Sequence, residues 1–297
     1  MSQTTVTRTV RFFEAQLRNA NHEAVLRDEW KSIFPDVHKR ILSIAESGSS
    51  LPPVTRNGLE YVGWAANDAL SCNDYLLIGK RRSTADNPGV EEGRGLPVPL
   101  SLQEGQNLVE PVYMVAVPGT SYVGTVGSSG CPRSGAMGYW LTRQGGYADH
   151  DLEVVLTPVL RKDAADRLER AKGGLSLTVR LPSEQIGEKT GRLWGALRAA
   201  RGMSHGNGVV TVSFSLGRHK VGREQEESDL LNTIQEAAEV EGAKTAQARV
   251  LIPDGDRMTR DTIDFIRDAL TYPARIPCAP SESPSDSSMV RSILDAT

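Results

Sequence analysis

The chain has 297 residues, of which 39% are hydrophobic and 24% charged, and its formal net charge is −3. This length exceeds the roughly 100–200 residues of a common domain, and the composition is that of a globular protein, which excludes fibrous and wholly disordered chains. The three cysteines lie far apart without a CxxC pair, and no secretory signal pattern opens the sequence, so we expect a cytoplasmic protein without a disulfide framework.

The first part of the chain predicts a sheet covered by helices. Residues 6–14 alternate apolar and polar side chains and are rich in β-branched residues, which is typical of a half-buried strand. Apolar residues recur at helical spacing over residues 22–47, where Pro35 is expected to divide two helical pieces. The same patterns predict strands at 58–65 and 75–79, a surface loop at 81–95, and a hairpin formed by 112–117 and 122–126.

A helix and a domain boundary are predicted near the middle of the chain. A short helix over residues 134–142 would bury Met137 and Leu141, which lie four residues apart and therefore share a face. Gly145 and Gly146 then indicate the edge of a first α+β domain, which we place at residues 1–148.

Strands and helices alternate in the second predicted domain, residues 149–271. Strands are predicted at 152–160, 175–181, 209–216 and 246–252, and helices at 163–171, 188–201, 224–240 and 259–270. Such alternation is typical of parallel βαβ units, but short elements also form α+β domains with antiparallel strands, and the sequence leaves both arrangements open.

The remaining residues, 272–297, contain little apolar material and are predicted to form a mobile tail with at most a short helix at 289–294. The predicted fold class is therefore α+β: a two-domain mixed sheet-and-helix protein with a mobile C-terminal tail.

The charges are unevenly distributed along the chain. The net charge is −2 over residues 1–110, +7 over residues 111–223 and −8 over residues 224–297. Residues 189–223, here called the basic stretch, contain no carboxylate. A solvated helix face usually mixes charge signs because like charges repel, so this distribution indicates a polyanionic ligand such as nucleic acid. The predicted contacts in the basic stretch are Lys189, Arg192, Arg198, Arg201, Arg218, Lys220 and Arg223.

Each part of the basic stretch allows two interpretations. Trp194, Arg198 and Arg201 share a face of the predicted helix, where the tryptophan could stack on a base and the arginines bind phosphates. Alternatively, Trp194 belongs to the core and the arginines extend beside it. The glycine-rich residues 202–208 could cradle a phosphate or end the helix, and the basic turn at 217–223 could lie on a DNA backbone or face solvent.

Two other charged segments bear on this hypothesis. The acidic helix that follows could pair with the basic stretch, within the chain or across a dimer, until DNA competes; its carboxylates are Glu224, Glu226, Glu227, Asp229, Glu236, Glu239 and Glu241. A second basic cluster, Lys80, Arg81 and Arg82, could reach the same ligand.

No catalytic motif stands out. The five histidines form no HExxH or HxH motif, and GxSxG is absent. Asp254 and Asp256 could hold a divalent metal in a nuclease, although a polar turn is the commoner role of such a pair. Residues 128–134 could form a nucleophile loop, but without an identifiable base a turn is the simpler interpretation. We expect no metal and no small-molecule cofactor.

Short motifs between residues 110 and 181 follow a recognisable order. Two apolar strands, 112–117 and 122–126, lead to a Gly-x-Pro turn formed by Gly130 and Pro132. A short helix around 139–141 follows, and then a strand that contains Pro158 and is followed by Arg161. This order resembles the RexA family, the exclusion proteins of lambda-type prophages. By position the resemblance carries over only Gly130, Pro132 and Arg161, of which the first two look structural.

The resemblance implies a two-domain, dimeric protein that binds DNA with little sequence preference and acts in superinfection exclusion, an abortive-infection form of phage defence, with a membrane protein as effector. We therefore expect a sequence-independent DNA-binding homodimer in which the cations of the basic stretch, together with Arg161, position the ligand electrostatically. The alternatives are a metal-dependent nuclease using Asp254 and Asp256, and a homo-oligomeric interaction protein that binds no nucleic acid.

Overall fold

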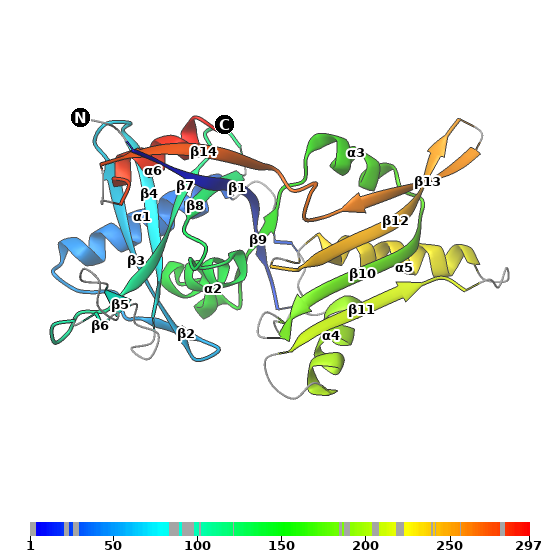
Figure 1. Cartoon of the computed structure of the whole chain (residues 1–297), viewed down its shortest axis with the longest axis horizontal. Helices are drawn as coiled ribbons and strands as arrows, with labels where there is room; N and C mark the ends of the chain where they lie inside the picture. The colour runs from blue at the N-terminus through cyan, green and yellow to red at the C-terminus, as the bar shows by residue number, and fades with distance from the viewer. Residues whose placement is uncertain are drawn as a thin grey trace. The chain divides into compact units, whose positions relative to one another are not determined.

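The structure, a computed structural model, shows a mixed α+β protein. The part of the chain that it describes comprises residues 4–20, 24–25, 30–82, 89–90, 98–100, 102–120, 122–183, 186, 191–203, 208–217, 223–238, 240, 242–255, 257–279 and 283–297. These residues form six α-helices and two antiparallel sheets of eight and four strands, besides one isolated strand pair (Figure 1).

The chain divides into two compact units. Unit 1 comprises residues 1–155 and 271–297, and unit 2 comprises residues 156–270. The boundary therefore falls a few residues after the one predicted at 148, and the C-terminal residues belong to unit 1.

The eight-stranded sheet of unit 1 has the order β14-β1-β8-β7-β4-β3-β2, and β9 pairs with β1. The strands are β1 (Thr4–Arg18), β2 (Val54–Arg56), β3 (Leu59–Asp68), β4 (Asn73–Arg81), β7 (Val109–Ala116), β8 (Tyr122–Gly127), β9 (Glu153–Pro158) and β14 (Thr271–Cys278). The predicted hairpin is confirmed by the antiparallel pairing of β7 with β8. The predicted loop at 81–95 lies largely outside the described residues, but β5 (Gly89–Val90) pairs with β6 (Val98–Pro99).

Helices α1 (Trp30–Glu46) and α2 (Ser134–Gly145) belong to unit 1, where the 3₁₀ turn Tyr147–His150 follows α2. Helix α1 is continuous through Pro35, so the predicted division into two pieces is wrong. Helix α2 buries Met137 and Leu141 as predicted. It ends at Gly146, whose φ of 80° lets its N–H bond back to the carbonyl of Arg143.

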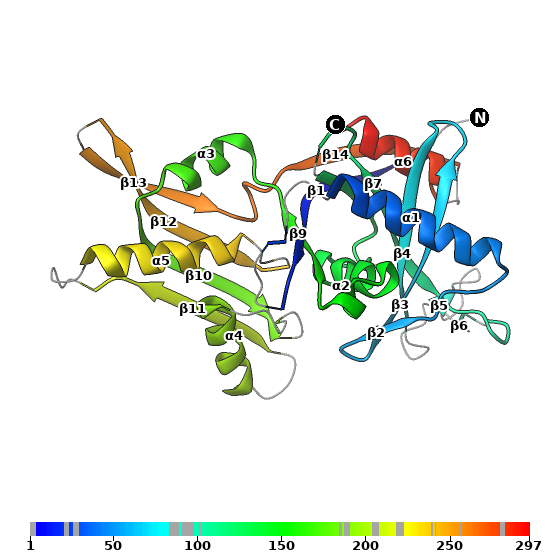
Figure 2. The same ribbon diagram turned by 180° about the vertical axis from the view of Figure 1, so that it is seen from behind.

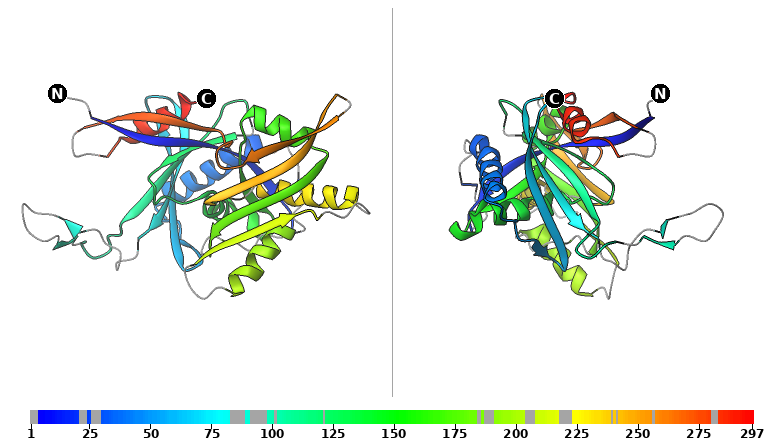
Figure 3. Two further views of the ribbon diagram at one scale, coloured as in Figure 1. Left: turned by 45° about the vertical axis from the view of Figure 1, so that its right-hand side comes forward. Right: turned by 90° about the vertical axis from the view of Figure 1, so that its left-hand side faces the viewer.

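The prediction of a mobile C-terminal tail is wrong. Strand β14 pairs with β1 over eight residues, and Figure 3 shows the two strands side by side in both views. Strand β14 is hard to recognise in the sequence because it buries few apolar side chains, among them Ala274 and Ile276. Pro273 and Pro277 also interrupt the alternating pattern of a strand. Prolines are tolerated there because β14 is an edge strand.

The short helix predicted at 289–294 is confirmed as α6 (Asp286–Leu294), which packs on the sheet of unit 1. The Ser285 hydroxyl caps it by accepting the N–H of Ser288. The carboxylate of Asp286 accepts the hydroxyls of Tyr75 at 2.8 Å and Tyr113 at 2.6 Å, so β4 and β7 both fix the start of α6.

Unit 2 is built on a four-stranded sheet of order β11-β10-β12-β13. Its elements are α3 (Lys162–Arg170), β10 (Gly173–Pro182), α4 (Arg192–Met203), β11 (Val209–Ser215), α5 (Arg223–Ala237), β12 (Thr245–Asp254) and β13 (Arg257–Asp264). All three strand pairings are antiparallel, which decides between the two arrangements that the sequence left open.

The helix predicted at 259–270 is wrong. Most of its first half is strand β13, which forms a hairpin with β12, and the turn contains Gly255 with a φ of 58°. The apolar residues Ile263 and Phe265 have the two-residue spacing of a strand, but together with Ile266 and Leu270 they also fit a helical period. Backbone pairing with β12 favours the strand over the helix.

Helices α4 and α5 cover one face of the sheet of unit 2. Figure 1 shows the sheet in front of these helices, and Figure 2, from behind, shows the helices in front of the sheet. Alternate residues of β10, Leu177, Val179 and Leu181, are buried in a core that includes Leu193 of α4 and Ile234 of α5. The other residues of β10 point to the opposite face.

Candidate nucleic-acid interface

The predicted cations of unit 2 lie on different elements. Arg192, Arg198 and Arg201 lie on α4, a helix that contains no carboxylate, and Arg223 opens α5. Lys189, Arg218 and Lys220 lie outside the described residues, as do parts of the glycine-rich segment 202–208 and of the basic turn 217–223.

Trp194 belongs to the core. Its side chain is only 4% exposed and packs with Leu193 and Leu197 of the same helix. The alternative interpretation of this residue is therefore the correct one, and Trp194 does not present a ring for base stacking. The arginines of α4 lie beside a packed tryptophan.

The N-terminus of α4 is already occupied by a carboxylate. Glu236 of α5 accepts the backbone N–H groups of Arg192 and Leu193, both at 3.0 Å. Gly191, with a φ of 120°, permits this approach, since a Cβ there would lie 2.2 Å from a Glu236 oxygen. A helix N-terminus attracts anions, and here Glu236 takes the place that a phosphate would occupy.

The acidic helix also pairs with the basic stretch, as one alternative anticipated. Arg192 Nη1 lies 3.5 Å from Asp229 Oδ2, and Arg223 Nε lies 2.8 Å from Glu227 Oε1. The side chains of Arg192 and Asp229 are 66% and 45% exposed. Exposed ion pairs contribute about 0–1 kcal/mol, so a phosphate can compete with Asp229 for Arg192.

Arg161 takes part in an internal ion pair. Its guanidinium lies 2.6 Å from Asp268, which also contacts Arg167 at 3.4 Å and accepts the backbone N–H of Asp264 at 3.1 Å. Asp268 is buried, so this network joins α3 to the segment after β13. The Arg161 side chain is 50% exposed, and its predicted role in contacting nucleic acid stays a prediction.

The second basic cluster forms ion pairs within unit 1. Lys80 and Arg82 lie 2.9 and 2.7 Å from Glu110, and Arg81 lies 2.8 Å from Glu60. Burial would raise the pKa of Glu110, but the two cations outweigh it and hold this pKa below its ordinary value. The three cations meet two carboxylates here, and the hypothesis that the cluster reaches the same ligand stays a prediction.

Gly130, which the resemblance carried over, lies against the same glutamate. A Cβ at this position would come within 2.2 Å of a Glu110 carboxylate oxygen, so the residue is structural, as expected. The adjacent segment forms a turn in which Cys131 donates its N–H to the carbonyl of Ser128. This agrees with the simpler interpretation of residues 128–134.

The two aspartates of the nuclease alternative lie at the β12–β13 turn. Asp254 is the exposed last residue of β12, and Asp256 lies outside the described residues. In the described ranges, no three His, Cys, Asp or Glu side chains are grouped so that they could hold a metal ion.

Further cations of unit 2, which the sequence did not indicate as ligands, include three arginines on its strands. Arg180, Arg249 and Arg260 are exposed residues of β10, β12 and β13. The signal was present in the strand sequences, because Arg180 and Arg249 alternate with buried residues and must therefore point away from the helices. That the three arginines share a face follows from the register in which the strands pair.

The fold and its charges define a two-unit α+β protein with cationic surfaces on its second unit. No helix in the described part of the chain is both long and apolar enough to cross a membrane. Comparison with known proteins finds no protein-family model that matches the chain and no curated protein with significant similarity. The resemblance to the RexA family stays a prediction.

Proposed function

We propose that the chain binds double-stranded DNA without sequence preference through the cations of unit 2. The observation that carries this proposal is helix α4, which has three arginines and no carboxylate on a partly exposed surface. Guanidinium groups bind phosphate oxygens through charge-assisted hydrogen bonds, and each phosphate that is neutralised releases counterions. The sides of α4 would contact the backbone, since Glu236 occupies its N-terminus.

The cellular role rests on the resemblance alone. We propose a cytoplasmic sensor in superinfection exclusion that binds DNA and activates a membrane-protein effector. A small multi-span membrane protein encoded beside this chain would support that role, and an isolated gene would contradict it.

The DNA-binding proposal is tested by reversing charges in the basic stretch. One variant, here called the stretch triple, combines Arg198→Glu, Arg201→Glu and Arg218→Glu. We expect it to bind a random-sequence duplex at least about tenfold more weakly than the wild type. Fluorescence anisotropy with two unrelated duplexes measures both the loss and the lack of sequence preference.

A matched control separates local contacts from overall charge. Arg11, Arg275 and Arg291 are exposed arginines of unit 1, and replacing all three by Glu, the control triple, changes the net charge equally. The control triple should bind nearly as the wild type does. Equal losses in both triples, or a wild type that binds no duplex at low salt, would contradict the proposal.

A homodimer is favoured by a separate observation at the edge strand β11. Edge strands usually carry charges, prolines or bulges that prevent pairing with other chains. Strand β13 carries four charged residues, β14 has two prolines, and β2 has three residues, whereas β11 (VVTVSFS) has neither charge nor proline and pairs regularly with β10. We propose that β11 pairs with β11 of a second copy.

Cysteine cross-linking tests this pairing. In a background with Ser at positions 72, 131 and 278, single cysteines at Val212, Ser213 and Phe214 should give disulfide-linked dimers under mild oxidation, because facing strand residues lie within disulfide reach. Met258→Cys on β13 is the control and should stay monomeric. Sedimentation that shows only monomer at tens of micromolar, with no cross-link above this control, would refute the dimer.

A further inference from the structure

The face of the unit 2 sheet opposite α4 and α5, here called the open face, is mainly polar, with Val209, Leu251 and Met258 among its apolar residues. Its residues are the alternate positions of the paired strands that point away from the core. Hydroxyl side chains form much of it, and they are Ser176, Thr178, Thr211, Ser213, Ser215, Thr245 and Thr262. Hydroxyl groups can donate hydrogen bonds to phosphate oxygens.

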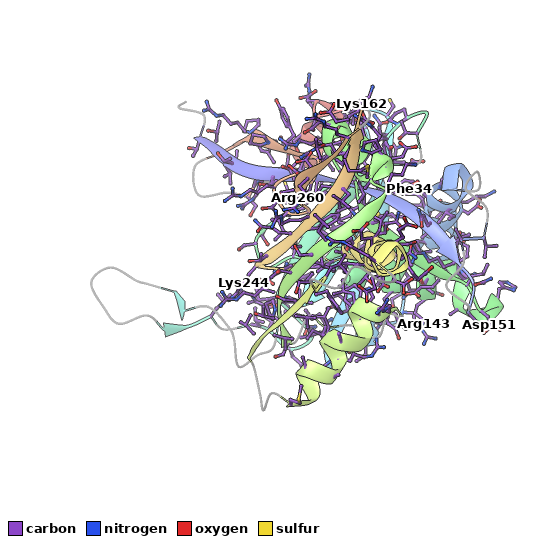
Figure 4. The ribbon with its side chains drawn as sticks, turned by 90° about the vertical axis from the view of Figure 1, so that its right-hand side faces the viewer. Phe34, Arg143, Asp151, Lys162, Lys244 and Arg260 are labelled. Atoms are coloured by element: carbon purple, nitrogen blue, oxygen red, sulfur yellow. The ribbon has the colours of Figure 1, made fainter. Side chains whose placement is uncertain are left out.

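Three arginines extend from the open face. Arg180, Arg249 and Arg260 are exposed, and among the described residues no carboxylate lies within ion-pair distance of any of them. Lys244 adds a fourth exposed cation next to Arg180, since its backbone N–H bonds to the Arg180 carbonyl at 2.7 Å. Figure 4 shows Arg260 and Lys244 on the side of the sheet away from α5.

The carboxylate on this face is engaged locally. Asp264, which faces Gln247 across the strands, accepts the Gln247 amide at 2.9 Å and the backbone N–H groups of Ile266 and Arg267 at 3.1 Å. Burial would raise the pKa of Asp264, but these hydrogen bonds hold it below its ordinary value. Asp264 thus stabilises a turn, and no carboxylate of the described residues neutralises the three arginines.

The strand register places the three arginines on a diagonal. Arg249 lies opposite Ser176, four residues along β10 from Arg180, which corresponds to about 14 Å between their Cα atoms. Arg260 lies opposite Leu251, two residues beyond Arg249, which corresponds to about 8 Å. The grooves of B-DNA are about 6 and 12 Å wide, so long arginine side chains at these spacings suit phosphates on both sides of a groove.

The side chains of the open face favour a duplex over a single strand. Single strands are usually held by aromatic side chains that stack on their bases. Among the described residues that point outward from β10, β11, β12 and β13, none is aromatic, and the aromatic residue of β11, Phe214, lies on the core side. Cations and hydroxyls without a stacking surface are the chemistry of backbone contacts.

We propose that the open face is a binding site for the phosphate backbone of duplex DNA, with Arg180, Arg249 and Arg260 as its central contacts. This inference rests on the proposed function and adds a second surface to it. The open face and α4 lie on opposite faces of one sheet, so each can be altered without changing the residues of the other.

The experiment compares three variants of equal charge by anisotropy with a random-sequence duplex. Arg180→Glu, Arg249→Glu and Arg260→Glu, the face triple, is measured beside the stretch triple and the control triple. The face triple should weaken binding at least about tenfold and lower the slope of log affinity against log salt by about 3, because each lost phosphate contact removes about 0.9. A set with Gln in place of Glu should give a smaller loss in the same direction.

The outcomes separate the inference from the proposed function. A wild type that binds no duplex refutes both. If the stretch triple loses binding while the face triple behaves like the control triple, only the open-face inference is refuted. If the face triple loses binding while the stretch triple behaves like the control triple, the result supports only the open face. Stronger binding of a single strand than of its duplex would contradict the duplex as the occupant. Circular dichroism and thermal unfolding of each triple show whether the fold persists. If the face triple with Glu unfolds, DNA binding by the set with Gln is compared with the wild type instead, and a set that binds as the wild type does refutes the open-face inference.

Discussion

Two glycines illustrate how single residues are constrained in this fold. Gly63 of β3 lies against Trp140 of α2, and a Cβ there would come within 2.2 Å of the indole ring. Trp140 is fully buried, so it has little room to move. Gly195 of α4, by contrast, has no atom within 4 Å of an added Cβ. Replacement by alanine should therefore change the stability of the protein in opposite directions at the two positions.

We predict that Gly63→Ala lowers the free energy of unfolding by about 1–3 kcal/mol, because overpacking a tight core forces side chains or backbone to shift. Gly195→Ala should raise it by about 0.5–1 kcal/mol, because alanine is the better residue inside a helix. Urea unfolding of the two variants measures both effects. A Gly63→Ala variant as stable as the wild type would contradict the close contact with Trp140.

At the scale of residues, sequence reasoning found what depends on near neighbours. Met137 and Leu141 are four apart on one helix, and their burial followed from that spacing. The partners of Arg161 and Glu110 could not be found in this way, because Asp268 and Arg82 are distant in sequence and meet them only after folding. Trp194 shows the same limit, since the sequence allowed both a stacking and a core role.

At the scale of elements, helix α6 depends on hydrogen bonds from two buried tyrosines. Burial, and then the hydrogen bond to Asp286, raise the pKa of Tyr75 to about 12. Burial also raises the pKa of Tyr113, again with the hydrogen bond to Asp286 as the next cause. Both hydroxyls must stay protonated to donate to the Asp286 carboxylate.

We predict a loss of stability in alkaline solution that begins with α6. Above about pH 10 a tyrosine in the unfolded chain ionises while Tyr75 and Tyr113 stay neutral, so stability is present below pH 10 and falls as the pH rises toward the raised values. The double variant Tyr75→Phe and Tyr113→Phe should show a shallower fall than the wild type. Urea unfolding at pH 8 and pH 11 measures this, with Tyr272→Phe as the exposed control.

An equal fall for the double variant and the wild type would mean that other groups control the alkaline transition. The serine-rich sequence before α6 concealed the importance of this helix, since the segment reads as a mobile linker. One of its serines, Ser285, is in fact the cap, and Ser287 donates a hydrogen bond to Asp68.

Strands rich in β-branched and other apolar residues, such as β7 and β8, were predicted well. Strands β13 and β14 were missed. Strand β14 pairs with β1 from the other end of the chain, and its few apolar residues are sufficient only because β1 supplies the backbone partners. Strand β13 was taken for a helix because its apolar residues fit both periods.

At the scale of the whole molecule, the small net charge conceals a strong separation of charge along the chain. The sequence predicted that the cations gather, and the structure shows that part of the acidic helix neutralises part of the basic stretch, through Asp229, Glu227 and Glu236. The cations of the open face could not be assigned to one surface from sequence. Their common face follows from the antiparallel order of the unit 2 sheet.

The salt dependence of DNA binding shows whether the chain holds DNA through its phosphates. The affinity of the wild-type chain for a random-sequence duplex, measured from 50 to 300 mM salt, should fall linearly on a double logarithmic plot with a slope of about −3 or steeper, since at least three phosphates are neutralised. Two duplexes of unrelated sequence should give the same line. A slope near zero, or an affinity that depends on one sequence, would contradict the account.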